Sequence, residues 1–230
     1  TGMGCRRRSS ITWSAVNPLS QARNGHQAVL LANGQVLVVG GTGASGFPLA
    51  DAEIFNPADG TWSGAGSLAT ARTLCTATRL NDGRVLVAGG WGVLGALASA
   101  EIFQPASRTW SPAAGSLTTE RYAHTASLLT DGRVLVAGGD DTTGWSPLAS
   151  AEIFNPVSCT WSLAAGSLKT ARYYHTAATL HEASPDTHIL VLLSTQATRN
   201  RGPFAGADAY LRKTDSPDRL LNAIHAFGGY

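Results

Sequence analysis

Short apolar runs that end in paired glycines recur along the chain. DGRVLVAGG stands at 82–90 and again at 131–139, and NGQVLVVGG at 33–41 is a near copy. Each run is apolar on both faces, which is typical of a strand with packed sheets on either side. No window of this repeated unit has apolar residues at the period of a helix, and the Gly-Gly and Asn-Pro pairs would interrupt any helix. The pattern therefore predicts an all-β fold.

Further strands flank each apolar run. HQAVLL at 26–31 and HTASLL at 124–129 predict a first strand, followed by Asn-Gly or Asp-Gly, which accept the positive φ of a type I′ hairpin turn. After the paired glycines, a loop of nine to eleven residues leads to AEIFNP at 52–57, AEIFQP at 100–105 and AEIFNP at 151–156. Proline ends each of these strands, since it cannot donate to a ladder. A Thr-Trp strand closes the unit of four strands.

Two independent landmarks give the same period. The arginine that opens each unit recurs at spacings of 49, 49 and 51 residues, and the tryptophan of the Thr-Trp pair recurs at 49, 48 and 51. These residues are Arg23, Arg72, Arg121 and Arg172, and Trp13, Trp62, Trp110 and Trp161. A β-sandwich does not require near-identical units, whereas radial repetition of one blade does.

The order Arg-x-x-His, an apolar run ending in Gly-Gly, Glu-x-Phe and Thr-Trp resembles the kelch repeat over residues 11–180. The resemblance implies a kelch-type β-propeller of four-stranded blades. It places the hairpin with the arginine and the paired glycines on the inside of each blade and the tryptophan strand at the outer edge. We expect an N-terminal tail at 1–10 and blades over 11–194, with units that start near residues 23, 72, 121 and 172.

The fourth unit departs from the pattern. HEASPDTH at 181–188 replaces the Asp-Gly turn, and ILVLLS at 189–194 lacks the paired glycines. Residues 195–230 are interpreted as a degenerate last blade or an irregular C-terminal tail. We expect about four blades, with the strand at 12–14 completing the last one so that no sheet edge stays unpaired. The alternative is part of a larger propeller, or a ring made from two chains.

Composition narrows the classes of partner. The net charge of +2 comes from 17 basic and 15 acidic residues, which gives no reason to expect nucleic acid. No apolar run approaches the roughly 18 residues that cross a bilayer. Three cysteines without Cys-x-x-Cys spacing support neither a disulfide framework nor a zinc site. Nothing in the sequence indicates a cellular compartment.

The repeated arginines are the first candidates for binding. The resemblance implies that Arg23, Arg72, Arg121 and Arg172 converge at the mouth of a central channel. Charges about 10 Å apart would repel by roughly 1.5–2 kcal/mol per pair, so the arginines need partners. The structural alternative, which we favour, pairs them with Glu53, Glu101 and Glu152, and Asp208 as a fourth acid. The functional alternative is an acidic ligand that the guanidinium groups bind bidentately.

The loops after the paired glycines are the second candidates, because variable loops on a rigid frame often bind ligands. Each carries one large aromatic residue, Phe47, Trp91 or Trp145, which suits stacking on a sugar or an apolar side chain, or else covers a blade end. The repeated His26, His124 and His175 have Cys75 in the fourth place, which favours packing over metal binding.

We therefore expect a non-enzymatic binding module that presents loops and an arginine-lined channel mouth to a protein or a glycan. The alternative is an enzyme similar to galactose oxidase, a copper radical oxidase. Tyr174 in ARYYHTAATL and Trp91 in GGWG stand at about the matching places. Neither a Tyr-His copper pair nor a cross-linking cysteine accompanies them, and no phosphate loop or Gly-x-Ser-x-Gly motif occurs. We expect no catalytic residue, no metal and no cofactor.

Overall fold

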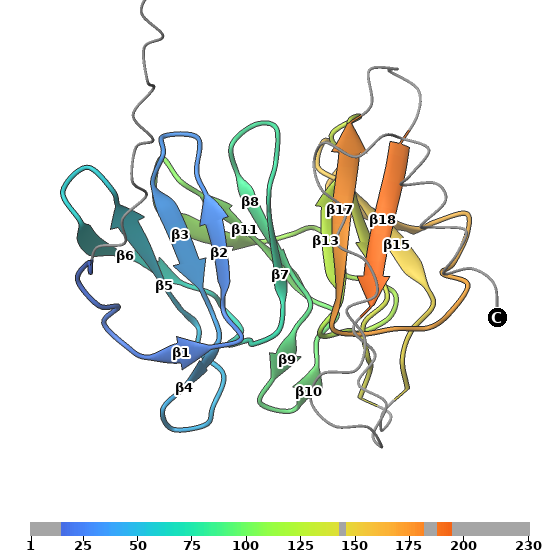
Figure 1. Cartoon of the computed structure of the whole chain (residues 1–230), viewed down its shortest axis with the longest axis horizontal. Coiled ribbons are helices and arrows are strands. Elements are labelled where there is room, and N and C mark those ends of the chain that lie inside the picture. Colours follow the sequence, from blue (N-terminus) through green and yellow to red (C-terminus); the bar gives the residue numbers. More distant parts are fainter. Residues whose placement is uncertain (1–14, 143–145, 182–187, 195–230) are drawn as a thin grey trace, which may run out of the picture.

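Three four-stranded antiparallel sheets and a hairpin follow one another along the chain (Figure 1). The computed structural model describes residues 15–142, 146–181 and 188–194, with 178–194 described by their backbone. Blade 1 consists of β2 (Gln27–Leu30), β3 (Val36–Val39), β5 (Asp51–Asn56) and β6 (Thr61–Ser67). Blade 2 consists of β7 (Thr76–Arg79), β8 (Val85–Ala88), β11 (Ala100–Gln104) and β12 (Thr109–Pro112).

The remaining strands complete the architecture. Blade 3 consists of β13 (Thr125–Leu128), β14 (Val134–Ala137), β15 (Ala151–Asn155) and β16 (Thr160–Leu163). A separate hairpin of β17 (His175–His181) and β18 (His188–Ser194) follows it. Two small ladders pair β1 (Arg23–Asn24) with β4 (Thr42–Gly43), and β9 (Trp91–Gly92) with β10 (Gly95–Ala96). Within the part of the chain that the structure describes, no helix is long and apolar enough to cross a membrane.

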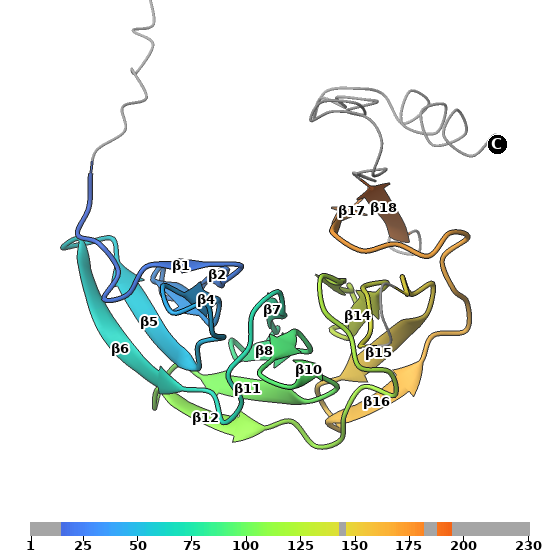
Figure 2. The same cartoon turned by 90° about the horizontal axis from the view of Figure 1, so that it is seen from below.

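The blades lie side by side around a common axis. The first strands of successive blades are neighbours, β2 beside β7, β7 beside β13 and β13 beside β17. Figure 2 shows them along the inside of an arc, with β6, β12 and β16 on the outside. The predicted all-β fold of four-stranded propeller blades is thus confirmed. The expected closing strand at 12–14 and the segment 195–230 lie outside the described residues, so the number of blades and the closure of the ring stay predictions.

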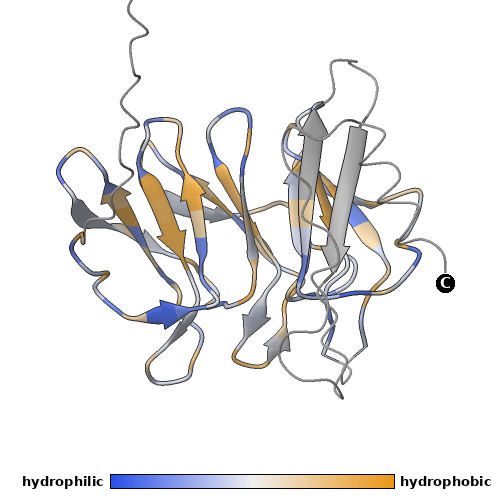
Figure 3. Ribbon diagram, in the orientation of Figure 1, coloured by the Kyte–Doolittle hydropathy of each residue, from blue (hydrophilic) through white to orange (hydrophobic). Residues whose placement is uncertain are grey.

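Apolar side chains join the blades face to face. Leu37 and Val39 of β3 pack in one cluster with Val85 and Val87 of β8 and with Phe103 of β11, and all five are fully buried. A second cluster joins blades 2 and 3 in the same way. Figure 3 shows β3 as hydrophobic along its length. A single four-stranded sheet cannot shield both of its faces, so each blade depends on its neighbours for burial.

Residues 15–22 make the same contacts with blade 1 that the end of each unit makes with the following blade. The backbone N–H of Ser20 donates to Glu53 at 3.0 Å, and the indole N–H of Trp62 donates to the carbonyl of Asn17 at 2.7 Å. The matching contacts of blade 2 are Ala69 to Glu101 at 2.7 Å and Trp110 to Ala65 at 2.8 Å. This segment therefore occupies the place of a preceding outer strand's end.

The inner hairpins turn differently from the prediction. In blade 1 the N–H of Gly34 donates to the carbonyl of Leu31 at 3.1 Å, and Leu31 in turn donates to Gln35 at 2.8 Å. Gly34 has φ +83°, but Asn33 has no positive φ, so the expected two-residue type I′ turn is wrong. The loop has three residues, a type I turn followed by a left-handed glycine. The Asn33 side chain favours this form because its Oδ1 accepts the N–H of Gln35 at 3.1 Å.

The paired glycines allow one blade's backbone to approach the next. The second glycine of each pair donates its N–H to the carbonyl of the arginine that opens the following unit, at 2.8–2.9 Å. These pairs are Gly41 with Arg72, Gly90 with Arg121, and Gly139 with Arg172. The first glycine lies against the same carbonyl, and a Cβ on Gly89 would be 2.5 Å from the Arg121 oxygen. Only glycine fits there.

A second backbone ladder runs along the inner side of the arc. The N–H groups of Leu74, Ala123 and Tyr174 each donate to the carbonyl of the equivalent residue one blade earlier, all at 2.9 Å, and the first acceptor is Gly25. All four residues have φ between +50° and +62°. Residues other than glycine are sterically strained at such a positive φ. The ladder therefore holds Leu74, Ala123 and Tyr174 in a strained backbone conformation.

Replacing Gly89 by alanine tests the close approach. We expect the free energy of unfolding to fall by about 3 kcal/mol or more, because the new Cβ adds a clash with the Arg121 carbonyl to the cost of a positive φ. Gly83→Ala is the matched control, since Gly83 also has a positive φ of +88° but open space around it, and it should cost about 1–2 kcal/mol. Equal losses in urea denaturation would contradict the close-approach explanation.

Candidate functional site

The repeated arginines lie inside the blades. The Arg72 side chain has no exposed surface, and its Nη2 donates to Glu101 Oε1 at 2.9 Å. Its Nη1 donates to the carbonyls of Gly89 and Ser99, both at 2.9 Å. Glu101 also accepts the N–H groups of Ala69 and Thr70 from the connection before the blade. The buried pair therefore has hydrogen-bond partners on both sides.

The same pair recurs in the other complete blades. Arg121 donates to Glu152 at 2.8 Å, and Arg23 donates to Glu53 at 2.9 Å and also to Asp51. Burial lowers the pKa of Arg121, and Glu152 opposes that change. Arg172 is half-buried, and its Nε donates to the carbonyl of Thr170 at 3.2 Å.

These contacts correct the expected arginine-lined channel mouth. The backbones of Arg23, Arg72 and Arg121 do stand at the start of the inner strands, but their side chains turn into the blades, where the glutamates and the Gly-Gly carbonyls offer acceptors. With side chains that are 0% exposed, the three guanidinium groups are not available to a ligand. The arginines instead form the expected pairs with Glu53, Glu101 and Glu152. Asp208, the expected fourth acid, lies outside the described residues.

Replacing Glu101 by glutamine tests the importance of the buried pair. We expect a loss of about 3 kcal/mol in the free energy of unfolding, because Arg72 would remain buried without a counter-charge. Asp131→Asn is the matched control: Asp131 pairs with Arg133, but both side chains are nearly half exposed, so the loss should stay below about 1 kcal/mol. Similar losses in urea titrations of the two variants would refute the assignment.

The repeated histidines link neighbouring blades. His124 Nε2 lies 2.9 Å from Thr76 Oγ1 of blade 2, and His175 Nε2 lies 3.0 Å from Thr125 Oγ1 of blade 3. Burial lowers the pKa of His124 to about 3 and that of His175 to about 4, and the nearby arginines act in the same direction. Burial also raises the pKa of the Cys75 thiol, in the equivalent position, to about 11. The described residues contain no cluster of three or more His, Cys, Asp or Glu side chains that could hold a metal ion.

The buried His124 makes stability depend on pH. Its pKa is about 6.5 in the unfolded chain and about 3 in the fold, so below pH 6.5 the unfolded state binds a proton that the folded state does not. We expect the free energy of unfolding to fall by about 2 kcal/mol from this group between pH 7.5 and pH 5. His124→Gln should reduce the dependence by this amount and leave the part that comes from His175, whereas Thr76→Val, which removes the hydrogen bond but no titrating group, should keep it. An unchanged slope in the glutamine variant would disprove this origin.

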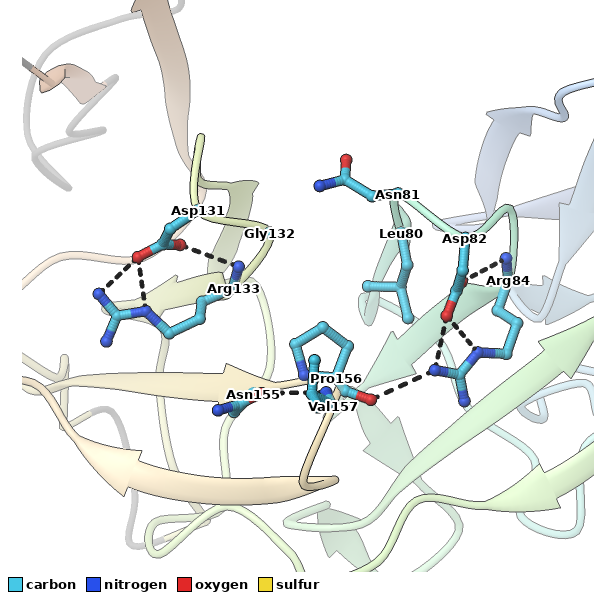
Figure 4. Close-up of a pocket in the computed structure, with 10 residues that line it drawn as sticks. All are labelled: Leu80, Asn81, Asp82, Arg84, Asp131, Gly132, Arg133, Asn155, Pro156 and Val157. Carbon is cyan, nitrogen blue, oxygen red and sulfur yellow. Dashed lines mark hydrogen bonds and ion pairs between the residues drawn. The ribbon is translucent and has the colours of Figure 1, made fainter. Parts of the chain in front are cut away.

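A cavity of about 540 Å³ lies between the inner hairpins of blades 2 and 3 (Figure 4). Two Asp-Gly-Arg turns flank it, and each arginine pairs with the aspartate of its own turn at 2.7 Å, Arg84 with Asp82 and Arg133 with Asp131. Arg84 also donates to the carbonyl of Pro156 at 3.3 Å. The charged groups of this cavity are thus already paired with one another. The sequence analysis did not predict this cavity, although the Asp-Gly-Arg turns that flank it recur at 82–84 and 131–133.

The loops that follow the paired glycines form the opposite end of the blades, where β4, β9 and β10 project (Figure 1). Phe47, in the loop after β4, is 62% exposed. Trp91 is half-buried, with its ring edge-on to Tyr122 at 5.0 Å. Tyr174, directly before β17, is 53% exposed. Trp145, the third expected loop aromatic, lies outside the described residues.

Two apolar residues at this end escaped sequence analysis. Val93 and Leu94 form the tip between β9 and β10, and they are 66% and 98% exposed. The signal in the sequence was the pair of apolar residues between two glycines in WGVLG, read there only as a variable loop. Together with Phe47 and Tyr174, they make this end rich in exposed apolar surface. We call it the loop end.

The arrangement of blades and glycines agrees with a comparison to protein families. The model of the KLHDC2/KLHL20/DRC7 Kelch-repeats domain matches residues 6–185. The chain belongs to the kelch-repeat family. A comparison with curated proteins gives no match. A protein-binding propeller is the role that membership of the kelch family suggests.

Blade 3 of the kelch domain carries a buried carboxylate at the loop end. Asp140 has no exposed surface; its Oδ2 accepts the hydroxyl of Tyr122 at 3.3 Å and its Oδ1 accepts the N–H of Asp141 at 2.9 Å. Burial, and then the Asp140 charge, raise the pKa of Tyr122 to about 12. The rings of Tyr173 and Tyr174 stand 5.3 Å apart. This group combines aromatic rings with negative charge.

Proposed function

We propose that the kelch domain is a non-enzymatic module that binds a protein partner at its loop end. The observation that carries the proposal is the exposure of Phe47, Val93, Leu94 and Tyr174 at that end. Large apolar side chains gathered on loops of a rigid frame are typical of an interaction surface. The other exposed large apolar residues among those described are dispersed over the remaining surface, at Val16, Leu30, Val157 and Leu163.

A protein suits this end better than a glycan. Glycan stacking needs exposed aromatic faces. Phe47 and Tyr174 are exposed but come from blade 1 and the last hairpin, whereas Trp91 stands half-buried against Tyr122. The tip at Val93 and Leu94 instead offers aliphatic surface, which favours apolar side chains of a partner. The buried arginine–glutamate pairs and the backbone ladders hold the loops on a preorganised scaffold, which reduces the entropy lost on binding.

Peptide display on the purified chain tests the proposal. Peptides selected from a proteome-derived phage library would be measured by fluorescence polarisation against the wild type and two variants. We expect Leu94→Ser to weaken the selected peptides at least tenfold, because Leu94 is 98% exposed at the loop end. Leu163→Ser is the matched control, since Leu163 is also exposed, at 63%, but lies on the outer strand β16. It should leave the affinities within about twofold.

Two results would overturn the proposal. One is a set of selected peptides that bind both serine variants as tightly as the wild type. The other is a loss of affinity in Leu163→Ser alone, which would move the binding surface to the outer edge of blade 3. Thermal melting curves of both variants would establish that each is folded before its affinities are compared.

A further inference from the structure

We propose that the loop end recognises a basic side chain, lysine or arginine, in its protein partner. The basic group would lie on the rings of Tyr122 and Tyr174, above the carboxylate of Asp140. This inference rests on the proposed function, because it names the chemistry of the partner that docks there. It is carried by the burial of Asp140, by the aromatic residues around it and by the place of both in the repeat.

Among the residues that the structure describes, no basic side chain forms an ion pair with Asp140. Its carboxylate is fully buried, and its hydrogen bonds come from two neutral groups, the Tyr122 hydroxyl and the Asp141 N–H. The other fully buried acid, Glu152, has the Arg121 guanidinium at 2.8 Å. A buried carboxylate is costly without a cation, so a basic group from a partner would stabilise it.

The surface above Asp140 is aromatic. Tyr122 is half-buried and is supported edge-on by Trp91, while Tyr174 is 53% exposed beside Tyr173. Aromatic faces attract ammonium and guanidinium groups through the ring quadrupole. The charges around the rings favour a cation as well, because Asp140 raises the pKa of both Tyr122 and Tyr174 in addition to the effect of burial.

The repeat itself singles out this position. The residue after each Gly-Gly pair forms a bridge with the residue after each repeated arginine, and the three pairs are Asn24 with Thr42, Thr73 with Trp91, and Tyr122 with Asp140. The backbone bridge is thus made with quite different side chains. The fold therefore does not require an acid or a tyrosine here, and blade 3 alone among these three pairs has both. A residue pair that departs from a constant framework points to a function beyond folding.

Charge on the same side of blade 3 supports the choice of a cation. Glu120 directly precedes Arg121 and accepts the hydroxyl of Thr142. Arg121 does not pair with Glu120, since its guanidinium is buried on Glu152. An acidic partner would be repelled from this end, whereas a basic side chain flanked by apolar residues would match both the tyrosines and the Val93–Leu94 tip.

Two synthetic peptides that differ in one charge test the inference. The probes are acetyl-Gly-Leu-Lys-Leu-Gly-amide and its analogue with norleucine in place of lysine, titrated into the ¹⁵N-labelled full chain. We expect saturable shifts of the Trp91 indole and Tyr122 amide signals with the lysine peptide, and at least tenfold weaker binding of the norleucine peptide. Asp140→Asn should remove this preference, while Asp131→Asn, at the opposite end, should keep it.

A second variant guards against a folding defect at the buried position. Tyr174→Leu preserves an apolar surface but loses the ring, so it should reduce the preference for lysine about threefold or more. Equal affinities for the two peptides, no binding of the lysine peptide, or a preference that survives Asp140→Asn in folded protein would each overturn the inference.

The outcomes separate this inference from the proposed function. Displayed peptides that depend on Leu94 but show no preference for lysine and no dependence on Asp140 would leave the loop end as a docking surface and remove the basic group. A lysine preference that depends on Asp140, in a chain whose selected peptides ignore Leu94, would keep the basic-group site and overturn the apolar docking surface.

Discussion

The contact between an arginine carbonyl and the paired glycines of the preceding blade is the constraint on which the structure depends. Arg72 shows how one residue joins two blades: its carbonyl accepts the N–H of Gly41 in blade 1, while its guanidinium binds Glu101 and the Gly89 carbonyl in blade 2. The side chain can turn into the blade only because the glutamate is there to receive it. Arg72 thus fixes both the distance between two neighbouring blades and the packing of polar groups inside one of them.

The strands and their order were predictable because they follow from local patterns. Apolar runs, proline stops and the two periodic landmarks define four strands per unit, and the pairing of β3 with β5 and of β5 with β6 has the predicted order. The turn type was not predictable from the dipeptide, because Asn-Gly fits two hairpin forms and the hydrogen bond from Gln35 to Asn33 favours the three-residue loop. The direction of the arginine side chains depended on acceptors about 30 residues away in sequence.

The candidate site was predictable only in part. The loops after the glycines were identified by their variation on a constant frame, and Phe47 is exposed there, which agrees with the proposed binding role. Trp91 proved to support Tyr122, since a ring's exposure depends on a neighbour from the next unit. Asp140 was not among the expected binding residues, because its burial beside Tyr122 is a tertiary property that no spacing reveals. Framework residues follow the repeat, whereas the residues of the proposed site depart from it.

The three junctions between units use the same carbonyl-to-glycine contact, at 2.9, 2.8 and 2.8 Å. Each unit carries the arginine carbonyl on the side that faces the preceding unit and the glycine pair on the side that faces the next one. These contact groups are equivalent from one unit to the next. Copying a unit in the gene would therefore place the new blade between surfaces that already fit it. Lengthening by whole units is an easy evolutionary step for such a chain, whereas a change to a single glycine or arginine must be matched on the adjoining blade.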